Sequence, residues 1–178
     1  ARRCEIVLNL LPLIYGESNR EVSLNILCSD SLKCEWTKVF NVEAFDYIIG
    51  NPPYVNTHDM AKETAQFLKR TFITTKSGVY NIFYAFIEHA MKFLANDGLL
   101  SYIVPNNFLT IKSATDLRKY IMDAKSLHQV LDFGNNMVFR PVRTYNCIIQ
   151  LTKHANETFN YFVMDATEDI EHELSLIE

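Results

Sequence analysis

The spacing of hydrophobic residues predicts an alternation of helices and strands. Between positions 79 and 95, apolar residues recur every three or four positions, which indicates a helix with one buried face. Residues 45–49 and 99–104 are short continuous apolar runs, which are typical of strands covered on both faces. The polar stretch 96–98 ends the helix as a cap and turn. The other expected elements are helices over 1–14 and 113–125 and strands over 22–28, 127–133, 144–152 and, shorter, 159–164.

This order of elements indicates the fold class. Strands alternate with helices, which favours an α/β fold built on a mostly parallel sheet. The 178 residues fit one domain, and 48% of them are hydrophobic, enough for a sizeable core. No apolar run is long enough to cross a membrane, and the chain does not open with the pattern of a signal peptide. We therefore expect a cytoplasmic location.

A stiff turn follows the strand at 45–49. Asn51 and Pro52 each precede a proline, so both are biased towards extended backbone, and the two prolines offer no N–H. With Tyr54, the turn presents carbonyl oxygens, one amide and one aromatic ring. Such a set suits an amino group held by acceptors while a ring stacks on its plane. The alternative is a plain Pro-Pro turn with Tyr54 in the core.

Charge is unevenly distributed. The net charge is −4, which does not indicate bulk affinity for nucleic acid. Residues 157–178, however, contain seven acids and no lysine or arginine, and the rest of the chain has 14 acids against 17 basic residues. The body is thus mildly basic, and the C-terminal stretch is acidic.

Cysteines and histidines form no recognisable metal or disulfide pattern. The four cysteines include no C-x-x-C pair, and the five histidines are scattered. Buried free thiols are the expectation, and we predict no metal site.

Two polar features allow two interpretations each. Asp30 follows the predicted strand 22–28, where α/β sheets place ligand-contacting groups, but a turn or helix-cap acid would look the same. The basic segment 56–78 is either a solvated helix and loop or a rim that touches substrate.

Four stretches together resemble the gamma-class adenine-specific DNA methyltransferases, including the modification domains of fused type II restriction-modification enzymes. Asn-Pro-Pro-Tyr alone also occurs in protein-glutamine and ribosomal RNA methyltransferases, so the order and spacing of the stretches carry the resemblance, over roughly residues 1–152. The stretches are 28–32, 43–54, 80–86 and 98–109, and the segment FGNNMVF, ending at Phe139, extends them.

The resemblance implies a Rossmann-like sheet, mostly parallel with one antiparallel strand, and the cofactor S-adenosylmethionine (SAM). Asp30 matches the acid that accepts a hydrogen bond from the SAM adenine, with Ser31 beside it. Phe86 matches an aromatic that packs on that adenine, although plain helix core is its alternative.

The resemblance also implies the target site, on double-stranded DNA. Asn51 and the Pro52 carbonyl match the acceptors for the target amino group, and Tyr54 matches a ring stacked on the flipped base. Phe139 matches the second aromatic, but Tyr145 lies close to it in the sequence and the alignment there is loose.

The chemistry explains why an asparagine suffices. The exocyclic nitrogen of adenine is a poor nucleophile because its lone pair is delocalised into the ring. Two acceptors aimed at its hydrogens favour the tetrahedral nitrogen that attacks the methyl group, and no strong base is needed. Flipping the base costs a few kcal/mol, and stacking of about 1–3 kcal/mol per base offsets part of it.

Several parts of the family pattern are missing. The sequence lacks the glycine-rich turn after the first strand, the acid that holds the SAM ribose, and a target-recognition domain. We therefore expect a partial catalytic domain at 1–153 and an acidic segment at 154–178 that leads to a missing recognition domain. Alone the chain should be inactive. With the first two strands absent, the strand at 22–28 cannot join its usual neighbour, and we expect a four-strand sheet whose exposed edge invites self-association.

Two rival functions remain open from the sequence. The first is methylation of a protein glutamine or a ribosomal RNA base. The second is a nucleic-acid-binding or partner-binding module without chemistry.

Overall fold

The computed structural model describes residues 25–135 and 144–164. The chain divides into two compact units, residues 1–42 and 43–178. Among the described residues, no helix has the length and apolar character needed to cross a membrane.

The described part of the first unit is mostly turn and coil. It contains one short helix, α2 (Trp36–Phe40), which ends at Asn41 with a left-handed φ of 52°. Residues 25–28, the described part of the strand predicted at 22–28, are not a strand, so that prediction is wrong there. The physical reason is that a strand needs a partner for its backbone groups, and residues 25–28 pair with no described strand.

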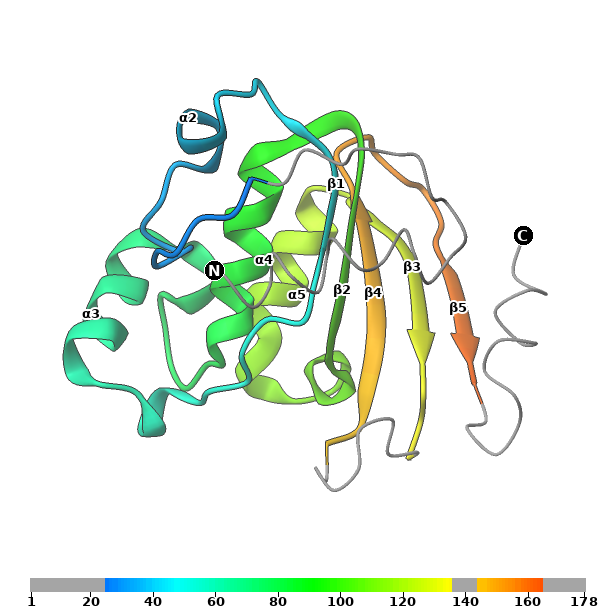
Figure 1. Cartoon of the computed structure of the whole chain (residues 1–178). Coiled ribbons are helices and arrows are strands. Elements are labelled where there is room, and N and C mark those ends of the chain that lie inside the picture. The colour runs from blue at the N-terminus through cyan, green and yellow to red at the C-terminus, as the bar shows by residue number, and fades with distance from the viewer. Residues whose placement is uncertain (1–24, 136–143, 165–178) are drawn as a thin grey trace, which may run out of the picture. The chain divides into compact units, whose positions relative to one another are not determined.

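The second unit is built on a five-stranded sheet (Figure 1). The strand order is β1-β2-β4-β3-β5, and β4 runs against the other four strands. The predicted α/β class is confirmed. The expected four-strand sheet is wrong in its strand number, because the short strand expected near the C-terminus pairs with β3 and extends the sheet past residue 153. The strands are β1 (Phe45–Gly50), β2 (Leu94–Pro105), β3 (Leu127–Asp132), β4 (Asn146–Thr152) and β5 (Asn160–Val163).

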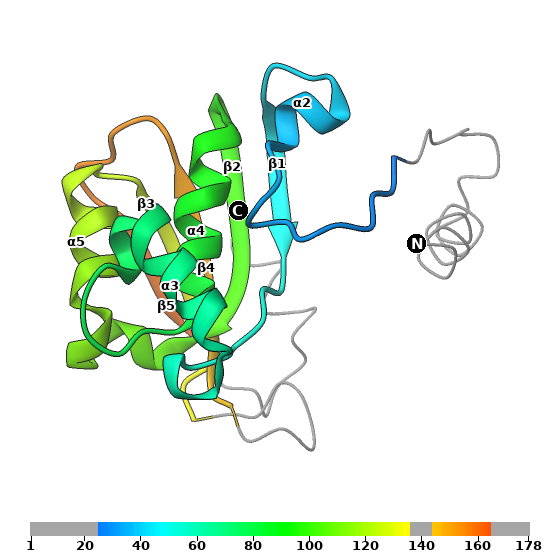
Figure 2. The ribbon, with the colours of Figure 1, turned by 90° about the vertical axis from the view of Figure 1, so that its left-hand side faces the viewer.

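Helices of the second unit lie together on one face of the sheet (Figure 2). They are α3 (Lys62–Thr71), α4 (Ile82–Phe93) and α5 (Thr115–Asp123). Alternate residues of β2, including Leu100 and Val104, are fully buried, as expected of a strand packed against helices on one side. Short 3-10 turns connect the elements: η1 (Thr57–Asp59), η2 (Ile73–Thr75), η3 (Asn106–Leu109) and η4 (Lys112–Ala114).

The segment 56–78 folds as η1, α3 and η2 and is anchored to α4 by a buried acid. Glu88 of α4 accepts hydrogen bonds from the backbone N–H groups of Ile73 (3.2 Å) and Thr74 (2.9 Å). Leu68 and Phe72 are buried. The segment is therefore an integral part of the helical layer.

The strand β1 is exposed on one face, contrary to the prediction that it is covered on both. Tyr47 and Ile49 keep 71% and 78% of their surface exposed, whereas Ile48 between them is buried. The reason is the position of β1. It is the terminal strand of the described sheet, and the helices described in residues 43–164 lie on only one face of that sheet.

The polar stretch 96–98 is part of β2 instead of a helix cap. Helix α4 ends at Phe93, and β2 begins at once with Leu94. The pairing of β1 with β2 jumps from Leu94 to Leu99, so residues 95–98 form an irregularity in the strand. Gly98 permits it, because a Cβ there would lie 2.9 Å from the Asp46 carbonyl oxygen and 2.9 Å from the Leu94 side chain.

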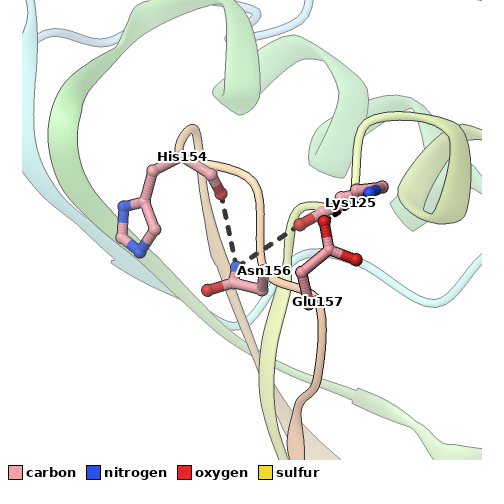
Figure 3. A network of polar contacts seen from close by, with 4 residues as sticks. All are labelled: Lys125, His154, Asn156 and Glu157. Atoms are coloured by element: carbon pink, nitrogen blue, oxygen red, sulfur yellow. Dashed lines mark hydrogen bonds and ion pairs between the residues drawn. The ribbon is translucent and has the colours of Figure 1, made fainter.

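A polar network closes the end of the sheet where β3 begins (Figure 3). Lys125 has a left-handed φ of 49°, and its carbonyl accepts a hydrogen bond from the Asn156 backbone N–H (2.8 Å). The Asn156 side chain donates to Thr152 Oγ1 (2.8 Å), and Lys125 Nζ pairs with Glu157. The network joins the α5–β3 turn to the β4–β5 loop at the end of the sheet where β3 begins.

Candidate active site

A cavity lies beyond the carboxyl ends of β1 and β2, next to the start of β4. Its volume is about 310 Å³. The carboxyl ends of parallel strands are where α/β proteins place ligand sites. Its walls come from the segment after β1, the start of α4, the turn after β2 and the segment before β4. The lining residues are Tyr54, Asn56, Val79, Tyr80, Asn81, Tyr84, Pro105, Asn106, Asn107, Ile111, Ser113, Thr144 and Tyr145.

The structure brings Asn51 and Tyr54 into contact. The Tyr54 hydroxyl lies 2.5 Å from Asn51 Oδ1 and 2.9 Å from the carbonyl oxygen of Ile103 on β2, and both oxygens are acceptors. Asn51 is exposed, Pro52 is buried and Tyr54 is half-buried. The turn is thus fastened to the end of β2, with its amide at the surface.

The Tyr54 ring also packs against the helical layer. It meets the ring of Phe83 edge to face, with 6.2 Å between the ring centroids. Burial, and secondarily the nearby Cys147 thiol, raises the pKa of Tyr54 to about 12. The hydroxyl therefore stays protonated, and remains a donor, at neutral pH.

The chain after the turn is joined to the start of α4. Asn56 and Asn81 form an isolated antiparallel bridge, and their side chains share a hydrogen bond of 3.2 Å. Thr57 Oγ1 donates to the Tyr80 carbonyl (2.7 Å) and accepts from the Tyr80 N–H (2.9 Å). These bonds place Asn56, Tyr80 and Asn81 in one wall. A bridge between two single residues leaves no periodic pattern in the sequence. The sequence therefore indicates no role for Asn56, and it indicates Tyr80 and Asn81 only as members of a family motif.

A buried carboxylate supports the opposite wall. Asn106 Nδ2 donates to Asp132 Oδ1 (2.8 Å) and to the Gly134 carbonyl (3.1 Å). Asp132 also accepts from the Gly134 N–H (2.9 Å) and from the Tyr161 hydroxyl (2.6 Å). Burial, and then the nearby Asp132 carboxylate, raises the pKa of the Cys147 thiol. The sequence indicated a turn at Asn106 but did not connect it to Asp132.

The residues predicted to bind the cofactor belong to different units of the chain. In the first unit, Asp30 Oδ1 accepts from the Leu32 N–H (3.2 Å), and Oδ2 pairs with Lys33 (3.3 Å). The Ser31 carbonyl accepts from the Trp36 indole (2.8 Å). These are the contacts of a turn, and the Asp30 side chain remains largely exposed. In the second unit, Phe86 is half-buried on α4.

Of the two candidates for a second stacking aromatic, Phe139 and Tyr145, the structure describes only Tyr145. Phe139 lies outside the described residues. Tyr145 lines the cavity and is about half exposed. Its carbonyl accepts from the Asn106 N–H (2.9 Å), which ties it to the turn after β2.

Comparison with known proteins reveals a family. The model of the Eco57I restriction-modification methylase family matches residues 13–139. The chain is 29% identical over 178 aligned residues to the type II restriction enzyme and methyltransferase RM.Eco57I of Escherichia coli, covering 86% of this chain and 18% of that protein. It is 30% identical over 132 residues to the type II methyltransferase M.HincII of Haemophilus influenzae, covering 72% and 26%. The chain thus spans only about a fifth to a quarter of these relatives.

Solved structures share the fold. The type IIL restriction-modification enzyme MmeI, in complex with DNA, superposes with a TM-score of 0.62 at 15% identity, over 85% of this chain and 22% of that one. A methyltransferase subunit of a type I restriction-modification system from Streptococcus thermophilus gives a TM-score of 0.56 at 18% identity, over 83% and 34%.

Proposed function

The chain belongs to the Eco57I restriction-modification methylase family, and we propose that it supplies catalytic motifs to a longer, SAM-dependent DNA methyltransferase that modifies adenine. Its sheet would be the part of a Rossmann-like methyltransferase sheet that lacks the first two strands. The relatives named as type II methyltransferases support the proposal, since such enzymes modify DNA.

The observation that carries the proposal is the placement of Asn51. Its amide oxygen is an exposed acceptor on a turn that is fastened to the ends of β1 and β2. The Pro52 carbonyl adds a second acceptor on the same stiff turn. Acceptors held in place favour the tetrahedral form of an attacking amino nitrogen without rearranging during the reaction.

The adjoining cavity supports the proposal that a single base is flipped into the site. Its volume of about 310 Å³ is at the small end of the range for ligand pockets. Tyr54 offers a ring at its margin, and amide side chains such as Asn81 and Asn107 offer polar contacts. An adenine inside a duplex cannot reach these groups, so the base must leave the stack.

Each unit contains a group of the kind that a cofactor adenine requires. SAM supplies an electrophilic methyl group when bound. In the first unit, the exposed carboxylate of Asp30, with Ser31 beside it, would accept a hydrogen bond from the adenine amino group. In the second unit, the half-buried ring of Phe86 would provide an apolar face for packing.

A methyl-transfer assay distinguishes between DNA, RNA and protein as the substrate. Methyl transfer from labelled SAM by the complete protein that contains this chain would be measured on DNA, ribosomal RNA and a protein release factor. We expect DNA to be labelled, and Asn51→Ala to lower the rate by roughly 100-fold or more. Asn96→Ala, on the exposed irregularity of β2, is the matched control and should retain the rate.

Each rival gives a different result. Labelling of RNA or protein in place of DNA would replace the proposed substrate. DNA binding without any methyl transfer would favour the binding-module interpretation. An Asn51→Ala variant as active as the control would overturn the assigned role of the turn.

A further inference from the structure

We propose that the Tyr54 hydroxyl is a positioning group that holds the Asn51 side-chain amide with its oxygen ready to accept the target amino group. This inference rests on the proposed function and adds to it. The stacking role assigned to Tyr54 uses only the ring, so the hydroxyl is a separate element of the site.

The geometry gives the hydroxyl two acceptors and one proton. Asn51 Oδ1 lies 2.5 Å away, and the Ile103 carbonyl oxygen lies 2.9 Å away. The first belongs to the turn, and the second belongs to β2. With one donor between them, the proton can serve either oxygen.

The bond to Asn51 decides which end of the amide is held. An asparagine side chain has an acceptor oxygen and a donor NH2 of nearly the same shape. Asn51 is exposed, and without a fixed neighbour its amide could turn and present N–H groups to another amino group, which offers no acceptor in return. A hydroxyl donor at Tyr54 selects the orientation in which oxygen faces it.

The Asn51 oxygen can accept the substrate while the hydroxyl still holds it. An amide oxygen has two lone pairs, so Asn51 Oδ1 can accept from the Tyr54 hydroxyl and from an amino group at the same time. The edge contact with Phe83 keeps the Tyr54 ring in place. Tyr54 can therefore fix the orientation of the amide both before and after the substrate binds.

The decisive variant is Tyr54→Phe, which keeps the ring and removes only the hydroxyl. In the complete protein we expect kcat for DNA methylation to fall roughly 10-fold, as for loss of one hydrogen bond. KM for DNA should stay unchanged, and so should the fluorescence gain of 2-aminopurine at the target position, because stacking persists. Tyr54→Leu should in addition lose the fluorescence gain.

The matched control is Thr71→Val. It also removes a side-chain hydroxyl that donates to a backbone carbonyl (Phe67, 2.8 Å), but Thr71 lies on α3 and does not line the cavity. Its kcat should stay within about twofold of the wild-type value. A general structural effect of losing one hydroxyl hydrogen bond would appear in both variants.

A structure of the Tyr54→Phe variant tests the inference independently of activity. We expect the Asn51 amide to turn or to adopt several orientations. An unchanged Asn51 side chain, an unchanged kcat, or a defect confined to KM and base flipping would overturn the inference. Absence of DNA methylation by the wild-type protein would instead overturn the proposed function, and the variant structure would still decide the role of the hydroxyl.

Discussion

Asn106 donates its side-chain amide to the buried carboxylate of Asp132 over 2.8 Å and thereby joins the carboxyl ends of β2 and β3. Asp132 is only 8% exposed, and it also accepts from the Gly134 N–H and the Tyr161 hydroxyl. One carboxylate thus organises one wall of the cavity.

We expect Asp132→Ala to destabilise the chain by about 1–3 kcal/mol, because it leaves three part-buried hydrogen bonds without their acceptor. Urea denaturation would measure the free energy of unfolding. Asp97→Ala, an exposed acid in β2, is the control and should change stability little. Equal unfolding midpoints for the two variants would contradict the importance of this carboxylate.

Gly98 should tolerate no side chain. A methyl group there would lie 2.9 Å from the Asp46 carbonyl oxygen, which is backbone and cannot move aside cheaply. We predict that Gly98→Ala costs about 1–3 kcal/mol of stability, measured by thermal or urea unfolding. Asn96→Ala in the same irregular segment should have a much smaller effect. If Gly98→Ala unfolds like the wild type, the packing of residues 95–98 against β1 is not as described.

Stability should decline at alkaline pH. Burial raises the pKa of Tyr54 and of Tyr120 to about 12, and the hydrogen bond to Asp132 raises the pKa of Tyr161 to about 12, from an ordinary value of 10.0. Because the unfolded chain loses these protons first as pH rises, their contribution is complete below about pH 10 and is lost as pH approaches 12.

Urea midpoints measured between about pH 9 and pH 12, together with tyrosinate absorbance, would show this decline. Tyr161→Phe should make the decline of the midpoint with pH less steep, since one of the groups with a raised pKa is removed. A midpoint that stays constant across this range would show that these hydroxyls are not held as the structure describes.

The free edge of β1 should promote self-association of this chain. Tyr47 and Ile49 are exposed, and β1 pairs only with β2 among the described strands. An unpaired edge with apolar side chains favours pairing with another chain. We expect sedimentation to show concentration-dependent oligomers that Ile49→Lys weakens.

Met122→Lys, which changes an exposed hydrophobic residue on α5, is the matched control and should leave association intact. A monomer at every concentration would refute the expectation. If Met122→Lys weakened association as much as Ile49→Lys, the added charge, and not the edge of β1, would control association.

Local patterns predicted much of the fold. The apolar runs at 45–49 and 99–104 and the helical spacing around Phe83 and Ile87 correspond to β1, β2 and α4, because strand and helix periodicities differ. The turn at Asn106 also follows a strand as expected. These features depend on residues close together in the sequence.

Features set by distant partners could not be predicted. Residues 25–28 have the composition of a strand but pair with no described strand. Tyr47 and Ile49 are apolar yet exposed, because β1 lies at the end of the described sheet. The polar stretch ending at Gly98 looks like a helix cap, but pairing with β1 draws it into β2. Likewise, the Asn106–Asp132 bond joins residues 26 positions apart, for which no local signal exists.

The Asn51–Tyr54 turn is proposed to hold the exocyclic amino group of adenine in DNA while that group is methylated. The most direct measurement is mass spectrometry of nucleosides from DNA that the complete protein has treated with SAM. We predict N6-methyladenine, with the product reduced at least roughly 100-fold in Asn51→Ala and unchanged in Asn96→Ala. N4-methylcytosine, or N6-methyladenine formed equally well by Asn51→Ala, would contradict the claim.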